Sequence, residues 1–155
     1  MDSCKLDPTD IGILNLLQKD AQLTLKELAH KLRRNKSVIG DRIKRLTNEG
    51  YIKNSVVIID VKRIKSIFTA FPLIQLKDHY EETFRSFQSM AIELPEVMEC
   101  HHVMGQYDFL LKIVVPDANA YNEFLRANII SLPYVLRIES FPMLSEVKKE
   151  TCYQL

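Results

Sequence analysis

Residues 24–52 constrain the fold more than any other part of the chain, because their pattern predicts two short amphipathic helices joined by a polar turn. Thr24 and Glu27 stand three residues apart, the spacing of a capping box in which each side chain accepts a backbone N–H of the other residue. Apolar residues then recur along one helical face. Asn35 or Ser37, in the polar turn, can cap the second helix.

The second helix combines an apolar stripe with a basic surface. Ile39, Ile43 and Leu46 recur at helical spacing, and Gly50 can end the helix in a left-handed conformation. Residues 31–46 hold seven Lys or Arg and one acid, in a chain whose formal net charge is only +1. A solvated helix face is the ordinary alternative, but the two-helix frame favours a helix-turn-helix that reads double-stranded DNA. The residues expected to contact DNA are Asn35, Lys36, Ser37, Val38, Arg42, Lys44 and Arg45.

These residues have different expected roles. Lysines and arginines that contact phosphates supply most of the affinity and make it depend on salt. Ser37 and Val38, near the start of the helix, are best placed to reach base edges. Replacing Arg42 and Arg45 together by alanine is therefore expected to abolish DNA retention while leaving any oligomer intact.

An earlier helix and a later hinge complete the first half of the chain. Asp7 and Pro8 are typical N-cap and N1 residues, so a helix begins there. Three helices enclose a small core, which predicts a winged-type helix-turn-helix domain over residues 1–52. The β-branched residues 56–59 indicate a strand, and we expect residues 53–65 to form a β hinge or linker.

The second half predicts an α+β domain over residues 66–155. Strand patterns alternate with helical ones in the order βαββαβ, which is the ferredoxin-like arrangement. Pro72 lies inside the first strand and predicts an edge position or a bulge there. With both helices on one face of the sheet, the other face is apolar and needs a partner, most simply a second copy of the chain. The predicted elements are strand 68–76, helix 80–94, strand 97–104, strand 107–115, a helix capped by Asp117, strand 135–143 and a possible last strand 147–153.

Composition narrows the setting of the protein. No stretch approaches the ~20 apolar residues of a membrane span, and the first ten residues lack an apolar run of signal-peptide length. We therefore expect a protein without a membrane partner. Cys4, Cys100 and Cys152 are odd in number and far apart. Such cysteines favour a reducing, cytoplasmic setting over a disulfide framework.

Neither a metal centre nor a catalytic site is predicted. Cys100 and His102 share one face of a strand, but His101 points to the other, and zinc needs three or four ligands. We therefore interpret these side chains as packed or interface residues. The sequence contains no nucleophile elbow, P-loop or dinucleotide-binding glycine pattern. No cofactor is expected.

Longer motifs give a resemblance that covers nearly the whole chain. The run LPEVMECHHVMGQYDFLLKIVVPDANAYNEFL contains LPEV, ECH, G-x-YD, LLK and VPD, and LDPTDIGILNLLQKDAQLTLKELA and RIKRLTNEGYI precede it. In these motifs and in the order of its elements the chain resembles the Lrp/AsnC family, the feast/famine regulatory proteins. The resemblance implies a transcriptional regulator that forms a homodimer through the sheet and often a tetramer or octamer. Many members bind a free amino acid between dimers, which here implies ligand contacts from Gly105, Gln106, Tyr107, Asp108, Ala118, Phe141, Pro142 and Met143.

The chain departs from the family at a few positions. The inter-helix turn usually reads Gly-Leu-Ser and is here Arg33–Asn35, and Gly40 is unusual inside a reading helix. Gln106 replaces an acidic residue that could hold an amino acid's ammonium group. The family's LPGV motif reads LPYV in this chain, so Tyr134 stands in place of its glycine. The alternative interpretation of Gly105–Asp108 is a hairpin turn with no role in ligand binding.

Two alternatives remain open. Some proteins that resemble this family decarboxylate tetrapyrroles, which needs histidines and arginines gathered in a cleft; here the four histidines and the arginines of the second half are scattered. A ligand-sensing oligomer with a degenerate DNA-binding head is the other alternative. DNA retention at low salt separates both from a regulator.

Overall fold

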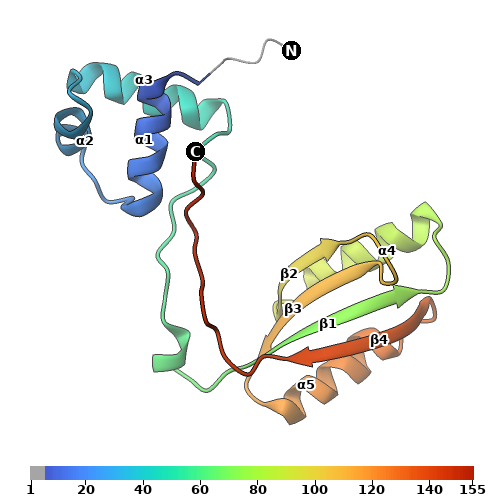
Figure 1. Ribbon diagram of the computed structural model, residues 1–155. Coiled ribbons are helices and arrows are strands. Elements are labelled where there is room, and N and C mark those ends of the chain that lie inside the picture. The colour runs from blue at the N-terminus through green and yellow to red at the C-terminus, as the bar shows by residue number, and fades with distance from the viewer. Residues whose placement is uncertain (1–5) are drawn as a thin grey trace. The chain divides into compact units, whose positions relative to one another are not determined.

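The computed structural model describes residues 6–155 and divides them into two compact units (Figure 1). We call the part up to Ile58, together with Lys148–Leu155, the helical unit. The sheet unit is Ile59–Val147. The expected domain boundary placed all of residues 66–155 together, whereas Lys148–Leu155 groups with the helices. Cys4 lies outside the described residues.

Three helices form the helical unit: α1 (Pro8–Lys19), α2 (Leu25–Leu32) and α3 (Lys36–Asn48). The predicted capping box of α2 is confirmed, since Thr24 and Glu27 each accept the other's backbone N–H. Asp7 caps α1 by accepting the backbone N–H groups of Thr9 and Asp10. The three helices share a core that consists of Ile13, Leu14, Leu28, Ala29, Ile39 and Leu46.

The predicted strand at residues 56–59 is not formed in the single chain. Its side chains are largely exposed, with Val57 at 81%, and a three-residue 3-10 turn, Val61–Arg63, follows it. The predicted strand at 147–153 is also absent. A β-branched sequence becomes a strand only when a neighbour pairs its backbone N–H and C=O groups. Among residues 6–155 no strand pairs with either segment.

The sheet unit has the predicted ferredoxin-like order. Its four antiparallel strands are β1 (Phe68–Leu76), β2 (Val97–His102), β3 (Phe109–Val115) and β4 (Val135–Pro142). They lie in the order β2-β3-β1-β4, so β3 is central. The helices of this unit are α4 (Glu81–Glu93) and α5 (Ala118–Leu125). The helices α4 and α5 share one core cluster with the alternate residues of β1 and β3, including Ala70, Ile74, Phe109 and Ile113. A π-helical turn, Arg126–Ile130, directly follows α5.

The prediction of an edge position or a bulge at Pro72 was wrong, because β1 is central and its register shows no shift at Pro72. Pro72 pairs with Ser140 of β4, while the β1–β3 register passes from Ala70 to Leu73. The sheet therefore accommodates the missing N–H of Pro72 by an interruption in the hydrogen-bond ladder between β1 and β3. The only irregularity between β1 and β4 lies further on, between Gln75 and Leu76.

Within the described residues of the sheet unit, both helices pack on one face of the sheet and none covers the opposite face. Phe71 and Leu73 of β1 are half-buried there, and Phe141, their neighbour on β4, is 48% exposed. No helix among residues 6–155 has the length and apolar character to cross a membrane.

Candidate nucleic-acid interface and ligand turn

The helix α3 presents a polar face away from the core of the helical unit. Ile39 and Leu46 are fully buried and fix the inward face of α3. Lys36, Ser37 and Lys44 are exposed. A helix held from behind, with lysines and small polar groups outward, has the form that enters the major groove of DNA.

The start of α3 leaves two further groups accessible. Asn35 occupies the N-cap position, yet its side chain makes no capping hydrogen bond. Its amide can therefore act as both donor and acceptor toward a ligand. Val38, on the first turn, is 38% exposed. Both residues remain candidates for contacts to base edges.

The turn between α2 and α3 holds a non-glycine residue in a left-handed conformation. Arg33 ends α2 with φ 51° and ψ 49°, and among the described residues no other non-glycine residue has a positive φ. The backbone N–H groups of Arg33 and Arg34 donate hydrogen bonds to carbonyl groups in the last turn of α2. The turn is thus built despite the missing glycine, at a conformational cost of roughly 1–2 kcal/mol.

Arg42 and Arg45 point to α1 instead of outward. Arg42 Nη1 lies 2.5 Å from Asp7 Oδ2 and 2.9 Å from Asp10 Oδ1. Arg45 Nη2 lies 2.6 Å from Asp10 Oδ2. The Asp10 side chain is 1% exposed, so the two guanidinium groups hold a carboxylate that water does not reach.

The pKa values follow from this cluster. Burial raises the pKa of Asp10, but hydrogen bonds from Arg45, the Asp7 backbone and Arg42 outweigh burial and bring the pKa below its ordinary value. The Asp10 backbone N–H, and next the Arg42 side chain, lower the pKa of Asp7 to about 2. Both carboxylates are therefore charged at neutral pH and pair with the arginines.

The predicted DNA-contacting set consequently divides in two. Arg42 and Arg45 fasten α3 to the start of α1, whereas the other five residues lie at accessible positions on or before α3. Sequence reasoning counted the arginines as surface charge because Asp7 was explained only as the N-cap of the first helix, and Asp10 follows it in the first turn. Their helical spacing of three was the available signal that one side of the α1 start is acidic.

The predicted ligand turn is folded inward at its acidic end. Gly105 has φ 131°, which side chains rarely adopt. Asp108 is buried, and its carboxylate accepts the Leu76 N–H at 2.7 Å and lies 3.0 Å from His79 Nε2. Asp108 thus anchors the turn to β1. Its carboxylate has little capacity left for a ligand.

Two charged residues that the sequence analysis missed adjoin this turn. The Tyr107 hydroxyl donates to the Glu139 carboxylate, and this hydrogen bond, with burial, raises the pKa of Tyr107. The Arg137 guanidinium lies 5.8 Å from the centre of the Tyr107 ring and 3.5 Å from Glu139. Arg137 and Glu139 are two apart on β4, so they share its face. This alternation was the signal that could have revealed them.

The rest of the predicted ligand set lies at the other end of the sheet. The β1 residue Ile74 pairs with Phe109, next to the turn, whereas Ala70 pairs with Pro142. Four strand residues separate these pairs along β1, about 13 Å. Within one chain the turn therefore does not converge with Ala118, Phe141, Pro142 and Met143.

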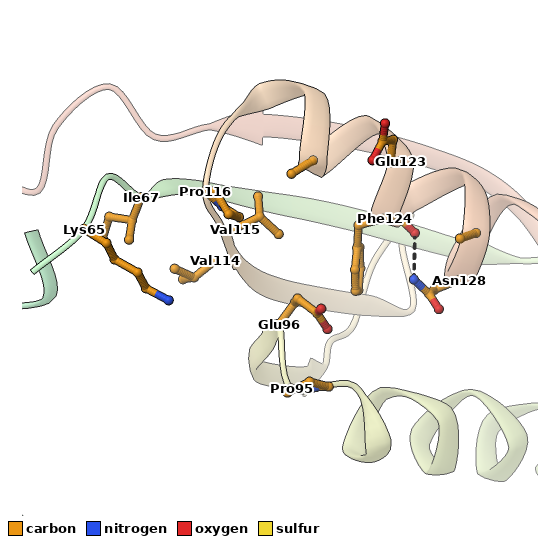
Figure 2. Close-up of a pocket in the computed structure, with 12 residues that line it drawn as sticks. Lys65, Ile67, Pro95, Glu96, Val114, Val115, Pro116, Glu123, Phe124 and Asn128 are labelled. Atoms are coloured by element: carbon orange, nitrogen blue, oxygen red, sulfur yellow. Dashed lines mark hydrogen bonds between the residues drawn. The ribbon is translucent and has the colours of Figure 1, made fainter.

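A cavity of about 540 Å³ opens on the helix side of the sheet unit (Figure 2). Val114, Phe124 and Ala127 give it apolar walls, while Lys65 and Glu96 bring opposite charges to it. None of the predicted ligand residues line it. It is a separate candidate for a small molecule.

The Cys-His-His run is engaged in packing and pairing. The His102 ring packs on Phe84 and Phe109, with centroids 4.8 and 5.2 Å apart. His101 Nε2 lies 3.3 Å from Glu99 Oε2. Burial raises the pKa of the Cys100 thiol. Residues 100–102 therefore interact with other residues of the sheet unit.

Two family models match successive parts of the chain. The Lrp/AsnC ligand binding domain matches residues 69–152, and the winged helix-turn-helix DNA-binding domain matches residues 6–53. The chain belongs to the Lrp/AsnC family. It is a DNA-binding transcriptional regulator of the Lrp/AsnC type, with a helix-turn-helix head and a ferredoxin-like ligand-binding tail.

Named relatives agree with this assignment. The leucine-responsive regulatory protein of Klebsiella pneumoniae is 32% identical over 144 residues, 93% of this chain and 88% of the relative. The transcriptional activator DecR of Escherichia coli K12 is 32% identical over 146 residues, 94% and 96% of the two chains. A Neisseria meningitidis transcriptional regulator, solved with L-methionine, superposes with a TM-score of 0.90 at 27% identity and covers 97% of each chain.

Proposed function

We propose that this Lrp/AsnC regulator reads DNA with the outer face of α3 and the residue before it, and that a free amino acid modulates this binding. The observation that carries the first half is the inward pairing of Arg42 and Arg45 with Asp10. That pairing orients α3 and leaves Asn35, Lys36, Ser37, Val38 and Lys44 as the DNA-contacting set.

The effector site, in this proposal, forms between copies of the chain. The two groups of predicted ligand residues lie at opposite ends of one sheet, so only a second copy can bring them together. Dimerisation through the uncovered sheet face would bury Phe71 and Leu73. Further assembly into a tetramer or octamer would join the turn of one dimer to the Phe141–Met143 wall of another.

Charges for an amino acid come from β4 rather than from the turn itself. Gln106 is neutral and Asp108 is occupied by Leu76 and His79. Besides the hydrogen bond from the Tyr107 hydroxyl, the Glu139 carboxylate has lone pairs that can accept hydrogen bonds from an ammonium group. Arg137 can donate hydrogen bonds to a carboxylate. The pair therefore offers what a zwitterion needs, in place of the acidic residue missing at position 106.

DNA binding is tested by fluorescence anisotropy with a labelled duplex at two salt concentrations. Lys36→Ala and Lys44→Ala should each weaken binding and reduce the salt slope by about 1, since each lysine would contact a phosphate. Lys19→Ala is the matched control, because Lys19 is an exposed lysine at the far end of α1. Equal losses in all three variants would contradict the assignment of α3 as the reading element.

The effector is tested by thermal shift with each protein amino acid in turn, because selective binding to the native state raises Tm. Glu139→Gln should remove the shift. Glu123→Gln, on the rim of the separate cavity, is the matched control and should keep it. Loss of the thermal shift in Glu123→Gln alone would place the effector site in the cavity. The absence of a shift with every amino acid would refute the proposal of an amino-acid effector.

A further inference from the structure

Residues 148–155 dock on α1 of the DNA-binding head through one side chain. The Tyr153 N–H donates to Gln18 Oε1 at 2.7 Å, and Gln18 Nε2 donates to the Tyr153 carbonyl at 3.3 Å. A single amide thereby pairs with both backbone groups of one residue, as a neighbouring strand would. The contact depends on backbone geometry, and the Tyr153 residue as a whole is 80% exposed.

A second contact completes the end of α1. The Gln18 carbonyl belongs to the last helical turn, where carbonyl groups lack a partner within the helix. The residue four further on, Gln22, donates its N–H to Asp20 instead. The Cys152 thiol donates to the Gln18 carbonyl at 3.0 Å. Cys152 is half-buried between exposed neighbours, so it is the side chain of this segment that inserts.

We propose that residues 148–155 are a functional part of the DNA-binding head and act as a strap that raises its affinity for DNA. The strap is the second stretch of chain that runs between the sheet unit and the helical unit, after residues 53–65. Two connections leave the head less freedom than one. Less freedom is then lost when the two heads of a dimer bind one duplex. The effect on affinity rests on the proposed DNA contact; the docking does not.

The docking is tested by hydrogen exchange at the Tyr153 amide, followed by NMR on the full chain. Gln18→Ala should speed this exchange about tenfold, because two hydrogen bonds are lost. Gln22→Ala is the matched control, since Gln22 is exposed and uses only its backbone N–H. Unchanged exchange in Gln18→Ala would overturn the docking.

The effect on DNA is tested with a second pair of variants. Tyr153→Pro removes the donating N–H without altering α1, and Gln154→Pro is its control. Tyr153→Pro and Gln18→Ala should both weaken DNA binding by about threefold to tenfold, with the melting of the sheet unit unchanged. Full affinity in both variants would overturn the strap. Failure of the unmodified chain to bind DNA would instead refute the proposed function, while the exchange experiment would still decide the docking.

Discussion

Removing the Asp10 carboxylate should destabilise the DNA-binding head far more than removing any carboxylate on its outer surface. Asp10→Ala leaves the guanidinium groups of Arg42 and Arg45 without the anion that both contact within 3 Å. It also deletes the capping-box hydrogen bond from the Asp7 N–H, 3.1 Å long. Two interactions between α1 and α3 and one within the α1 cap therefore disappear together.

The expected loss is about 3 kcal/mol. Breaking a buried ion pair costs roughly 3–5 kcal/mol, and the lower end applies because Arg42 and Arg45 retain 28% and 36% exposure and can be partly rehydrated. A unit of about 60 residues shifts its Tm by roughly 4–8 °C per kcal/mol. The Tm of the head should then fall by about 12–24 °C.

Far-ultraviolet circular dichroism during thermal melting measures this change, because the helical unit carries much of the helix signal. Asp41→Ala is the control: Asp41 is an exposed carboxylate on α3 itself and should change Tm by a degree or two at most. Arg42→Ala should lower Tm as Asp10→Ala does, and lose DNA binding only as far as the head unfolds. A stable head in Arg42→Ala with DNA binding abolished would refute the structural role of Arg42.

Further variants test other parts of the molecule. Arg33→Gly should stabilise the head by roughly 1 kcal/mol, since glycine adopts φ 51° without strain. Gly40→Ala should add about 1 kcal/mol more, because a Cβ there would meet only Leu25 Cδ1 at 3.7 Å; chemical denaturation measures both. Asp108→Ala should cost about 1–3 kcal/mol in the melting of the sheet unit, since it leaves the Leu76 N–H without its acceptor. The pKa of Asp7 lies at about 2 against an ordinary 3.8, so its stabilising effect is complete above about pH 4 and is lost as pH falls through about 2. In the Asp7→Asn variant, the free energy of unfolding should fall less steeply as pH decreases from about 4 to about 2.

Local sequence signals predicted the elements of this chain well. Thr24 and Glu27 located the start of α2, and the left-handed Gly50 at φ 80° follows the end of α3 as expected. These features depend on residues a few positions apart, so their chemistry is legible along the chain. The βαββαβ order followed from periodicity for the same reason.

Features that depend on distant partners were harder to predict. The role of Arg42 requires Asp10, which lies 32 residues away in the sequence. The strand expected at residues 56–59 required a neighbour that the single chain does not supply. Gly12 gave no signal either, although a Cβ there would stand 2.7 Å from Leu32 Cδ2 and require the Leu32 side chain to move. Packing between elements decided each case.

The candidate site was predicted in its chemistry more than in its geometry. The basic second helix was located by charge, but charge alone did not separate Lys44, which is exposed, from Arg45, which pairs with a buried acid. The turn at Gly105 was located by resemblance, yet Asp108 points inward. The charged pair that adjoins the turn comes from β4, a strand that lies 30 residues further along.

The most direct measurement is the affinity of the unmodified chain for a labelled DNA duplex at low salt and again at moderate salt. A regulator that grips phosphates with Lys36 and Lys44 should bind clearly at low salt and lose affinity steeply as salt rises. Lys36→Ala with Lys44→Ala should weaken binding and lessen that slope by about 2, while the head melts at its usual temperature. Absence of binding by the folded chain at low salt, or a double variant that binds as tightly as the unmodified chain, would contradict DNA reading by α3.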